Sequence, residues 1–183
     1  ADDRYRYGYY HSCFNFSVVF AKRFCKRFGY GFGKRLIMVD INNKKSIALL
    51  YENVRTHLLN VVLSFWYEHT RDTVNGGYTT ALDRMGKPLK SEREKNMWMQ
   101  ARQIWMFSRI YIDIEHDEKW LNLAEHGCVF LLSSAAYAGK GRWNYLLSED
   151  GTQVLKGSIS IFTDAFVLMA LCAYAEAVQK KAA

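Results

Sequence analysis

The stretch NMWMQARQIWMFSRIY, residues 96–111, is almost entirely apolar or aromatic, yet Arg102 stands in its middle. Apolar side chains with this spacing predict an amphipathic helix, which we expect over residues 92–114. On a helical wheel one stripe carries Trp98, Arg102, Trp105 and Arg109, and the next stripe carries Met97, Ala101, Ile104, Ser108 and Tyr111. The two arginines therefore share one face of the predicted helix.

The two arginines differ in their neighbours. Asp113 follows Arg109 by four residues, so we predict a solvated ion pair worth a few tenths of a kcal/mol. Arg102 has tryptophan and methionine at the same spacings and no acidic residue, and burial without a partner would cost several kcal/mol. Two interpretations stay open: Arg102 lies across tryptophan faces at the surface, or it lines a wet, concave pocket with tryptophan walls. In the second case its fixed donors suit the oxygen atoms of a sugar.

The rest of the chain predicts more helices and two short hairpins. Helical spacing recurs over residues 46–68, 118–133 and 158–179. Turn-forming residues within residues 78–89 and 141–155 indicate short hairpins between the helices. Because the connections between successive helices are short, we expect an all-α assembly of antiparallel neighbours with small strand additions.

Two of these helices, at residues 92–114 and 158–179, are apolar on nearly every side. Such helices need cover on every side, which a chain of four helices does not supply. We therefore expect a larger assembly or a partner surface, with a homodimer as one possibility. No apolar run approaches the length of a membrane span, so a membrane partner is not expected.

Residues 1–37 differ in composition from the rest of the chain. They hold 8 Lys/Arg against 2 Asp/Glu, whereas residues 38–183 hold 17 against 16. The net charge of +7 is therefore local to this basic, aromatic segment and does not indicate a nucleic-acid partner. The segment is a cationic membrane-surface peptide, a disordered arm, or non-native sequence ahead of a start at Met38. We favour the third interpretation.

Motifs for a metal or a phosphate-bearing cofactor are missing from the sequence. The four cysteines show neither C-x-x-C spacing nor a histidine cluster, so no zinc site is predicted. The glycines of GYGFGKR do not have the spacing of a phosphate loop. We expect a reduced, cytoplasmic protein without a cofactor.

Five blocks of sequence carry a resemblance to a known family. They are FWYEHTRDTVNGGYTTALDRMGKPL, WMQARQIWMFSRIY, WLNLAEHGCVFLL, RWNYLLSEDG and SIFTDAF. In order and spacing they resemble the N-terminal part of the N-acylglucosamine 2-epimerases, a family that includes renin-binding proteins and cellobiose 2-epimerases. The resemblance covers residues 49–177. It implies that residues 38–183 form the N-terminal portion of an (α/α)6 barrel whose inner helices line a sugar-binding cleft.

The resemblance also implies site residues on the helix at residues 92–114. Arg102 matches the arginine of the family motif W-L-Q-G-R-Q-x-W, which implies contact with substrate near the reacting carbonyl. Trp98 and Gln100 belong to the same block and are implied substrate-binding residues. Ala101 replaces the glycine often found in the motif, which leaves the branch of the family in doubt.

Three further site residues are implied nearer the end of the chain. Tyr145 falls near a cleft aromatic of the family, and Trp143 is a second candidate beside it. Asp164 lies where the family varies between acidic and other polar residues. The implied reaction is proton transfer at C2 of an aldose, an epimerisation or isomerisation of a small sugar such as an N-acylhexosamine.

The family's paired catalytic histidines lie in its C-terminal half, beyond the match to this chain. None of the chain's own histidines matches them: His11, His57, His69, His116 and His126. We therefore expect this chain to hold one wall of the pocket and to be inactive alone. The alternative is a non-catalytic partial barrel that binds a sugar or a protein.

Overall fold

The computed structural model describes residues 42–182. The basic, aromatic segment of residues 1–37 lies outside the described residues, so its interpretations stay predictions. The chain divides into two compact units, residues 1–51 and 52–183. Of the first unit, the structure describes residues 42–51, where the side chain of Asn43 accepts a 3.0 Å hydrogen bond from the backbone N–H of Lys45 at the start of helix α2.

The first predicted helix is present as three consecutive helical segments. They are α2 (Lys44–His57), the π-helical segment η1 (Leu58–Leu63) and α3 (Ser64–His69). In the wider turn of η1, the Ser64 hydroxyl donates a 3.1 Å hydrogen bond to the carbonyl oxygen of Leu59. The prediction of a helix over residues 46–68 is confirmed. Most of its apolar residues are exposed, however; Leu63 is buried in the core with 1% exposure, and Leu58 and Leu59 pack against the core.

Helix α4 (Met97–Asp113) contains Arg102 and most of the apolar stretch of residues 96–111. It begins later than the predicted residue 92, because Lys95 and Asn96 form strand β1 (Lys95–Asn96). The side chain of Asn96 then caps the helix by accepting a 3.3 Å hydrogen bond from the Met99 N–H. The stripe predicted beside Arg102 forms its core face and is buried throughout: Met97, Ala101, Ile104, Ser108 and Tyr111.

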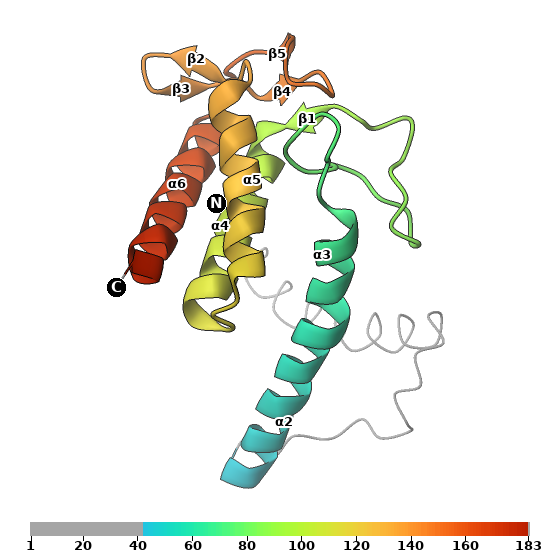
Figure 1. The fold of residues 1–183 in the computed structure, drawn as a ribbon, viewed down its shortest axis with the longest axis vertical. Helices are drawn as coiled ribbons and strands as arrows, with labels where there is room; N and C mark the ends of the chain where they lie inside the picture. Colours follow the sequence, from blue (N-terminus) through green and yellow to red (C-terminus); the bar gives the residue numbers. More distant parts are fainter. Residues whose placement is uncertain (1–41, 183) are drawn as a thin grey trace, which may run out of the picture. The chain divides into compact units, whose positions relative to one another are not determined.

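Helix α5 (Glu118–Ser133) has the predicted bounds. Asp117 caps it by accepting a 2.9 Å hydrogen bond from the Lys119 N–H. A short turn joins α4 to α5, and the two helices run antiparallel (Figure 1). The predicted face of α5 is buried as a whole: Trp120, Leu123, Ala124, Gly127, Phe130 and Leu131.

Helix α6 (Ile161–Ala182) packs along α4 through small buried residues, among them Ala170 and Ala177. Contacts from Trp98 to Phe166 and, further along both helices, from Arg109 to Glu176 show that α4 and α6 run parallel. By length and composition α6 could cross a membrane, so the statement that no apolar run approaches this length is wrong. In this structure α6 packs against α4 along one side, and 28% of its apolar window is buried.

The strands are short and cluster at one end of the helices (Figure 1). One sheet has the order β1-β4-β5, with β4 (Leu146–Leu147) antiparallel to both neighbours, and β5 is Val154–Lys156. The other sheet pairs β2 (Tyr137–Gly139) with β3 (Arg142–Trp143). The hairpin predicted at residues 78–89 is reduced to one isolated antiparallel bridge between Leu82 and Pro88.

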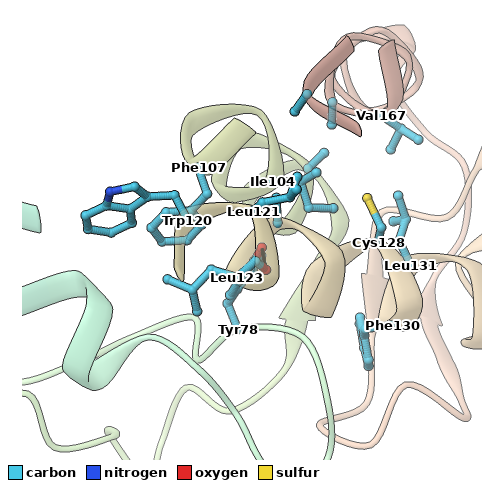
Figure 2. Close-up of a cluster of buried hydrophobic side chains, with 14 of the residues drawn as sticks. Tyr78, Ile104, Phe107, Trp120, Leu121, Leu123, Cys128, Phe130, Leu131 and Val167 are labelled. Carbon is cyan, nitrogen blue, oxygen red and sulfur yellow. Dashed lines mark hydrogen bonds between the residues drawn. The ribbon is translucent and has the colours of Figure 1, made fainter. Parts of the chain in front are cut away.

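The core of the second unit lies between α4, α5 and α6, with Tyr78 inserted from the loop that follows α3 (Figure 2). Phe107 of α4 stacks on Trp120 of α5 with ring centroids 6.1 Å apart. The Tyr78 hydroxyl donates a 2.8 Å hydrogen bond to the carbonyl oxygen of Leu123, which satisfies its polar atom in a fully buried position. The prediction of an all-α assembly with small strand additions is confirmed.

Candidate functional site

Arg102 lies where α4 faces α6. Its side chain is exposed, and the guanidinium carbon lies 5.9 Å from the ring centroid of Trp98 and 5.5 Å from that of Phe166. Cation–π contacts of this kind contribute about 0.5–1 kcal/mol at exposed sites. Within residues 42–182, Arg102 makes no ion pair, so its donors are not engaged by a carboxylate.

The two rings beside Arg102 hold each other in place. Trp98 and Phe166 are stacked, with centroids 5.5 Å apart and an interplanar angle of 21°. The indole Nε1 of Trp98 is buried, and no hydrogen-bond partner for it is present in the described part of the chain. Stacking on Phe166, rather than a hydrogen bond, therefore sets the position of the Trp98 ring.

In the structure the guanidinium of Arg102 lies beside aromatic rings at an exposed position, an arrangement that both interpretations of this residue allow. Besides Trp98, the ring beside Arg102 is that of Phe166. The predicted tryptophan walls would have included Trp105, but Trp105 is 38% exposed and makes no ring contact with Arg102. In the part of the chain that the structure describes, pockets of about 290, 440 and 270 Å³ lie among residues 59–149, and Arg102 lines none of these three. The role of Arg102 in a sugar cleft stays a prediction.

Gln100, a predicted substrate-binding residue, is fully buried. Its Oε1 accepts a 2.8 Å hydrogen bond from the Tyr78 N–H, and its Nε2 donates a 2.8 Å hydrogen bond to the Tyr78 carbonyl oxygen. The side-chain amide bonds both the N–H and the carbonyl oxygen of Tyr78, as a neighbouring strand would, and so holds the loop after α3 against α4. In this structure Gln100 is therefore a positioning group for the loop, and its contact with substrate stays a prediction.

Asp164, in the first turn of α6, holds strand β3 in place. Its Oδ1 accepts a 2.8 Å hydrogen bond from the Trp143 N–H, and its Oδ2 lies 2.6 Å from Nε of Arg142. The ring of Trp143 packs against Tyr137 with centroids 5.4 Å apart. Asp164 and Trp143 are thus brought together, and the carboxylate of Asp164 is already engaged by two partners.

Tyr145 lies beside the start of α4. Its carbonyl oxygen accepts a 3.0 Å hydrogen bond from the Met97 N–H, and the ammonium of Lys156 lies 5.4 Å from its ring centroid. Tyr145 is therefore attached to the helix that carries Arg102. No ring contact or ion pair joins it to Arg102 in residues 42–182.

Lys95, just before α4, is a buried cation that the sequence analysis missed. Its side chain is 1% exposed, and its ammonium lies 2.6 Å from Oδ2 of Asp72. It also donates hydrogen bonds of 3.0 and 3.1 Å to the carbonyl oxygens of Gly76 and Tyr78. The three protons of the ammonium therefore have three acceptors.

Burial lowers the pKa of Lys95, while the hydrogen bond and charge of Asp72 act in the opposite direction. For Asp72, burial alone would raise the pKa, but hydrogen bonds from Asn75 and Lys95 outweigh it and hold the pKa below its usual value. Through this ion pair and the two carbonyl acceptors, Lys95 joins the loop after α3 to the start of α4.

His126 on α5 completes the attachment of the same loop. Its Nε2 lies 3.1 Å from the carbonyl oxygen of Asp72 and 2.8 Å from that of Gly77. Because both neighbours are acceptors, Nε2 must carry the proton and donate. Burial and the charge of Arg71 lower the pKa of His126. His126 therefore attaches helix α5 to the loop that follows α3.

Phe166 is the other residue that sequence reasoning missed. It lies in the block SIFTDAF, in which only Asp164 was selected, because the sequence does not show which face of the last helix meets α4. For Lys95 a signal was also lacking, since a lysine within the polar run SEREKN is usually solvated. Within residues 42–182, no group of three or more His, Cys, Asp or Glu side chains is placed to hold a metal ion.

Comparison with known sequences identifies the family. The profile of N-acylglucosamine 2-epimerase (GlcNAc 2-epimerase) matches residues 76–183. The chain is 37% identical to N-acylglucosamine 2-epimerase of Rattus norvegicus over 116 residues, which are 62% of this chain and 27% of that protein. It is 30% identical to cellobiose 2-epimerase of Dictyoglomus turgidum over 137 residues, 74% of this chain and 34% of that protein. The chain thus spans about a quarter to a third of the length of these relatives.

Solved structures show the same fold. A sugar epimerase from a ruminal bacterium superimposes with a TM-score of 0.61 at 23% identity, over 72% of this chain and 33% of that one. Cellobiose 2-epimerase from Spirochaeta thermophila gives 0.61 at 22% identity, over 73% and 32%. These proteins are (α/α)6 barrels, so the helices described here form part of such a barrel, as the resemblance implied. The chain belongs to the N-acylglucosamine 2-epimerase family.

Proposed function

We propose that this protein acts in the 2-epimerisation or isomerisation of an aldose, and that Arg102 is its contact to the reacting end of the sugar. The observation that carries the proposal is the guanidinium of Arg102, which is exposed, lies beside the stacked rings of Trp98 and Phe166, and makes no ion pair within residues 42–182. Family membership and the names of the relatives, N-acylglucosamine 2-epimerase and cellobiose 2-epimerase, support the reaction class.

The chemistry requires more than one group. Removing the proton at C2 places negative charge on the neighbouring carbonyl oxygen, and a fixed cationic donor stabilises that charge. Arg102 suits this task because a guanidinium stays charged at any working pH. The proton itself needs general bases on both faces of the carbon. We assign Arg102 the donor role alone.

The substrate we propose is an N-acylhexosamine or a related aldose. Trp98 offers an indole beside the guanidinium, and indoles suit the C–H faces of sugars. Trp143, Tyr145 and Asp164 stay candidates for contacts further along the sugar. Of these, Asp164 has the least freedom, because Arg142 and the Trp143 backbone already bind its carboxylate.

We also propose a cytoplasmic location and self-association as a homodimer. Cys128 and Cys172 are free thiols, and the Cys172 side chain is exposed, which suits a reducing compartment. Exposed apolar side chains on α5 and α6 support association, among them Leu132 at 67% and Leu168 at 64%.

Sugar binding by the chain tests the role of Arg102. Titration with N-acetylglucosamine and with cellobiose, followed by NMR of the ¹⁵N-labelled protein, gives the affinity of the wild type, Arg102→Gln and Arg109→Gln. Hydrogen bonds to charged groups contribute about 1.5–3 kcal/mol, so Arg102→Gln should weaken binding at least about tenfold. Arg109→Gln is the matched control and should bind as the wild type does. Equal affinity of Arg102→Gln and wild type, or no binding of either sugar to the wild type, would overturn the proposal.

A further inference from the structure

Two arginines on one face of α4 reach toward α6, and they do so by different interactions. The guanidinium of Arg109 lies 2.5 Å from Oδ2 of Asp113 and 3.0 Å from Oε2 of Glu176 on α6. The guanidinium of Arg102, two turns earlier, meets the ring of Phe166 on α6. The same pair of helices therefore holds one arginine by carboxylates and the other by aromatic rings.

The two kinds of contact leave the arginines with different numbers of free donors. A guanidinium carries five N–H donors in its plane, and carboxylates bind at that edge. Aromatic rings instead interact with the cation through their π-electrons, so they accept no conventional hydrogen bond from it. The N–H donors of Arg109 are engaged by the carboxylates of Asp113 and Glu176. Arg102 is held near its rings with its N–H groups still available to a ligand.

Phe166 supplies a contact to Arg102 from a second helix, α6. Trp98 lies one turn before Arg102 on the same helix, so their contact is local. Phe166 comes from α6 and touches both: it stacks on Trp98 at 5.5 Å, and its centroid is 5.5 Å from the guanidinium carbon. One ring thereby limits the movement of the indole and of a long, otherwise exposed side chain.

We propose that Phe166 is a positioning residue for Arg102, holding the guanidinium between α4 and α6 without consuming its donors. The role rests on the proposed function, in which those donors meet a sugar oxygen. Its physical basis is that a preorganised donor loses less rotational freedom on binding than a freely moving one. Phe166 itself need not touch the substrate.

Helix α6 supplies a matched control for Phe166. Phe162 lies one turn earlier, is 66% exposed, and makes no ring contact in the described part of the chain. Phe162→Leu and Phe166→Leu therefore make the same chemical change on the same helix, one away from Arg102 and one beside it. Phe166→Tyr keeps the ring and serves as the conservative variant.

The first measurement is the NMR resonance of the Arg102 Nε–Hε group, assigned by its loss in Arg102→Lys. Rings near the guanidinium displace this resonance by their ring currents. Phe166→Leu should move it toward the position of a freely solvated arginine, whereas Phe162→Leu and Phe166→Tyr should leave it near the wild-type position. An unchanged resonance in Phe166→Leu, or an equal change in Phe162→Leu, overturns the proposal.

The second measurement is affinity for N-acetylglucosamine and cellobiose. Losing one cation–π contact should weaken binding about two- to fivefold in Phe166→Leu, with little change in Phe162→Leu and recovery in Phe166→Tyr. Wild-type affinity in Phe166→Leu overturns the positioning role. If the resonance moves as expected while the wild type binds no sugar, the contact between Phe166 and Arg102 stands and the proposed sugar-binding function fails.

Discussion

The ammonium of Lys95 donates a 2.6 Å hydrogen bond to Oδ2 of Asp72 and thereby joins the start of α4 to the loop that follows α3. The same carboxylate accepts hydrogen bonds from the backbone N–H groups of Val74 and Asn75 through Oδ1. One buried pair thus fixes both the turn of the loop and its attachment to the helix that carries the candidate site.

Replacing Lys95 by methionine should destabilise the fold strongly. Methionine fills a similar volume, but it leaves the half-buried carboxylate of Asp72 without its cation and removes the ammonium that donates to the Gly76 carbonyl oxygen. Breaking a buried pair by removing one partner costs about 3–5 kcal/mol. We expect a loss of this size in the free energy of unfolding, measured by urea denaturation.

The exposed Lys90 is the control for that substitution. Lys90→Met should change the free energy of unfolding by no more than about 0.5 kcal/mol. Combining Lys95→Met with Asp72→Asn should recover part of the loss, because no unpaired charge then remains. A single Lys95→Met variant as stable as Lys90→Met would show that the pair does not hold the loop.

Gly127 on α5 faces the ring of Tyr78, and a Cβ atom at this position would overlap that ring. Alanine favours a helix over glycine by about 1 kcal/mol, but overpacking a core costs about 1–3 kcal/mol. Tyr78 cannot easily move away, because it is fully buried and its hydroxyl binds the Leu123 carbonyl. We therefore expect Gly127→Ala to lower the thermal midpoint, measured by circular dichroism.

Gly157 gives the comparison for this steric effect, since a Cβ atom there meets nothing closer than 3.8 Å. Gly157→Ala should be neutral or slightly stabilising, because alanine lowers the entropy of the unfolded chain. A Gly127→Ala variant more stable than the wild type would mean that helix propensity outweighs the contact with Tyr78.

The lowered pKa of His126 predicts a pH dependence of stability. As the pH falls through about 6.5, the unfolded state binds a proton that the folded state still excludes, so stability falls. Glutamine keeps an N–H donor for the two carbonyl oxygens but does not titrate. The free energy of unfolding in urea should therefore vary less between about pH 7.5 and 5.5 for His126→Gln than for the wild type. If the free energy of unfolding of the wild type and of His126→Gln depended on pH in the same way, the folded state would not exclude a proton from His126.

Proton exchange at C2 of a sugar should not be catalysed by this chain alone. Nδ1 of His116 lies 3.3 Å from the Tyr111 carbonyl oxygen, and Nε2 of His126 binds two carbonyl groups, so neither nitrogen is placed beside Arg102. Losing a general base typically costs 10² to 10⁴ in rate. Incubating N-acetylglucosamine with the chain in D₂O and following its C2 proton by NMR tests this; exchange above the buffer rate would show a base that we have not identified.

Local sequence signals predicted the helices well and their ends less evenly. Helix α5 has its predicted bounds, because Asp117 caps it within the polar stretch before its apolar face begins. Helix α4 starts later than predicted, because Lys95 and Asn96 pair with Leu146 and Leu147 from far along the chain. Such a pairing leaves no local pattern in the sequence.

At the candidate site, too, the features that depend on local helical spacing were predicted, and those that depend on contacts between distant segments were not. The absence of an acidic neighbour for Arg102 follows from helical spacing, and the ion pair between Arg109 and Asp113 was predicted and is present. The second ring beside Arg102 depends on which face of α6 meets α4, and an apolar helix of almost uniform composition does not reveal that. The sequence therefore identified the cation but not Phe166, which holds it.

Exposed apolar side chains on α5 and α6 predict that the chain self-associates. Val129 and Leu132 on α5 are 59% and 67% exposed, and Leu168 on α6 is 64% exposed. Burying apolar area contributes about 25 cal/mol per Å², so association of these faces is favourable. Sedimentation should show concentration-dependent oligomers, and a dye that binds apolar surface should become fluorescent. Leu132→Glu and Leu168→Glu should reduce both signals, whereas Val74→Glu, a change at an 88% exposed loop position, should not. A monomer with little dye binding would show that these side chains are isolated in water and form no associating face.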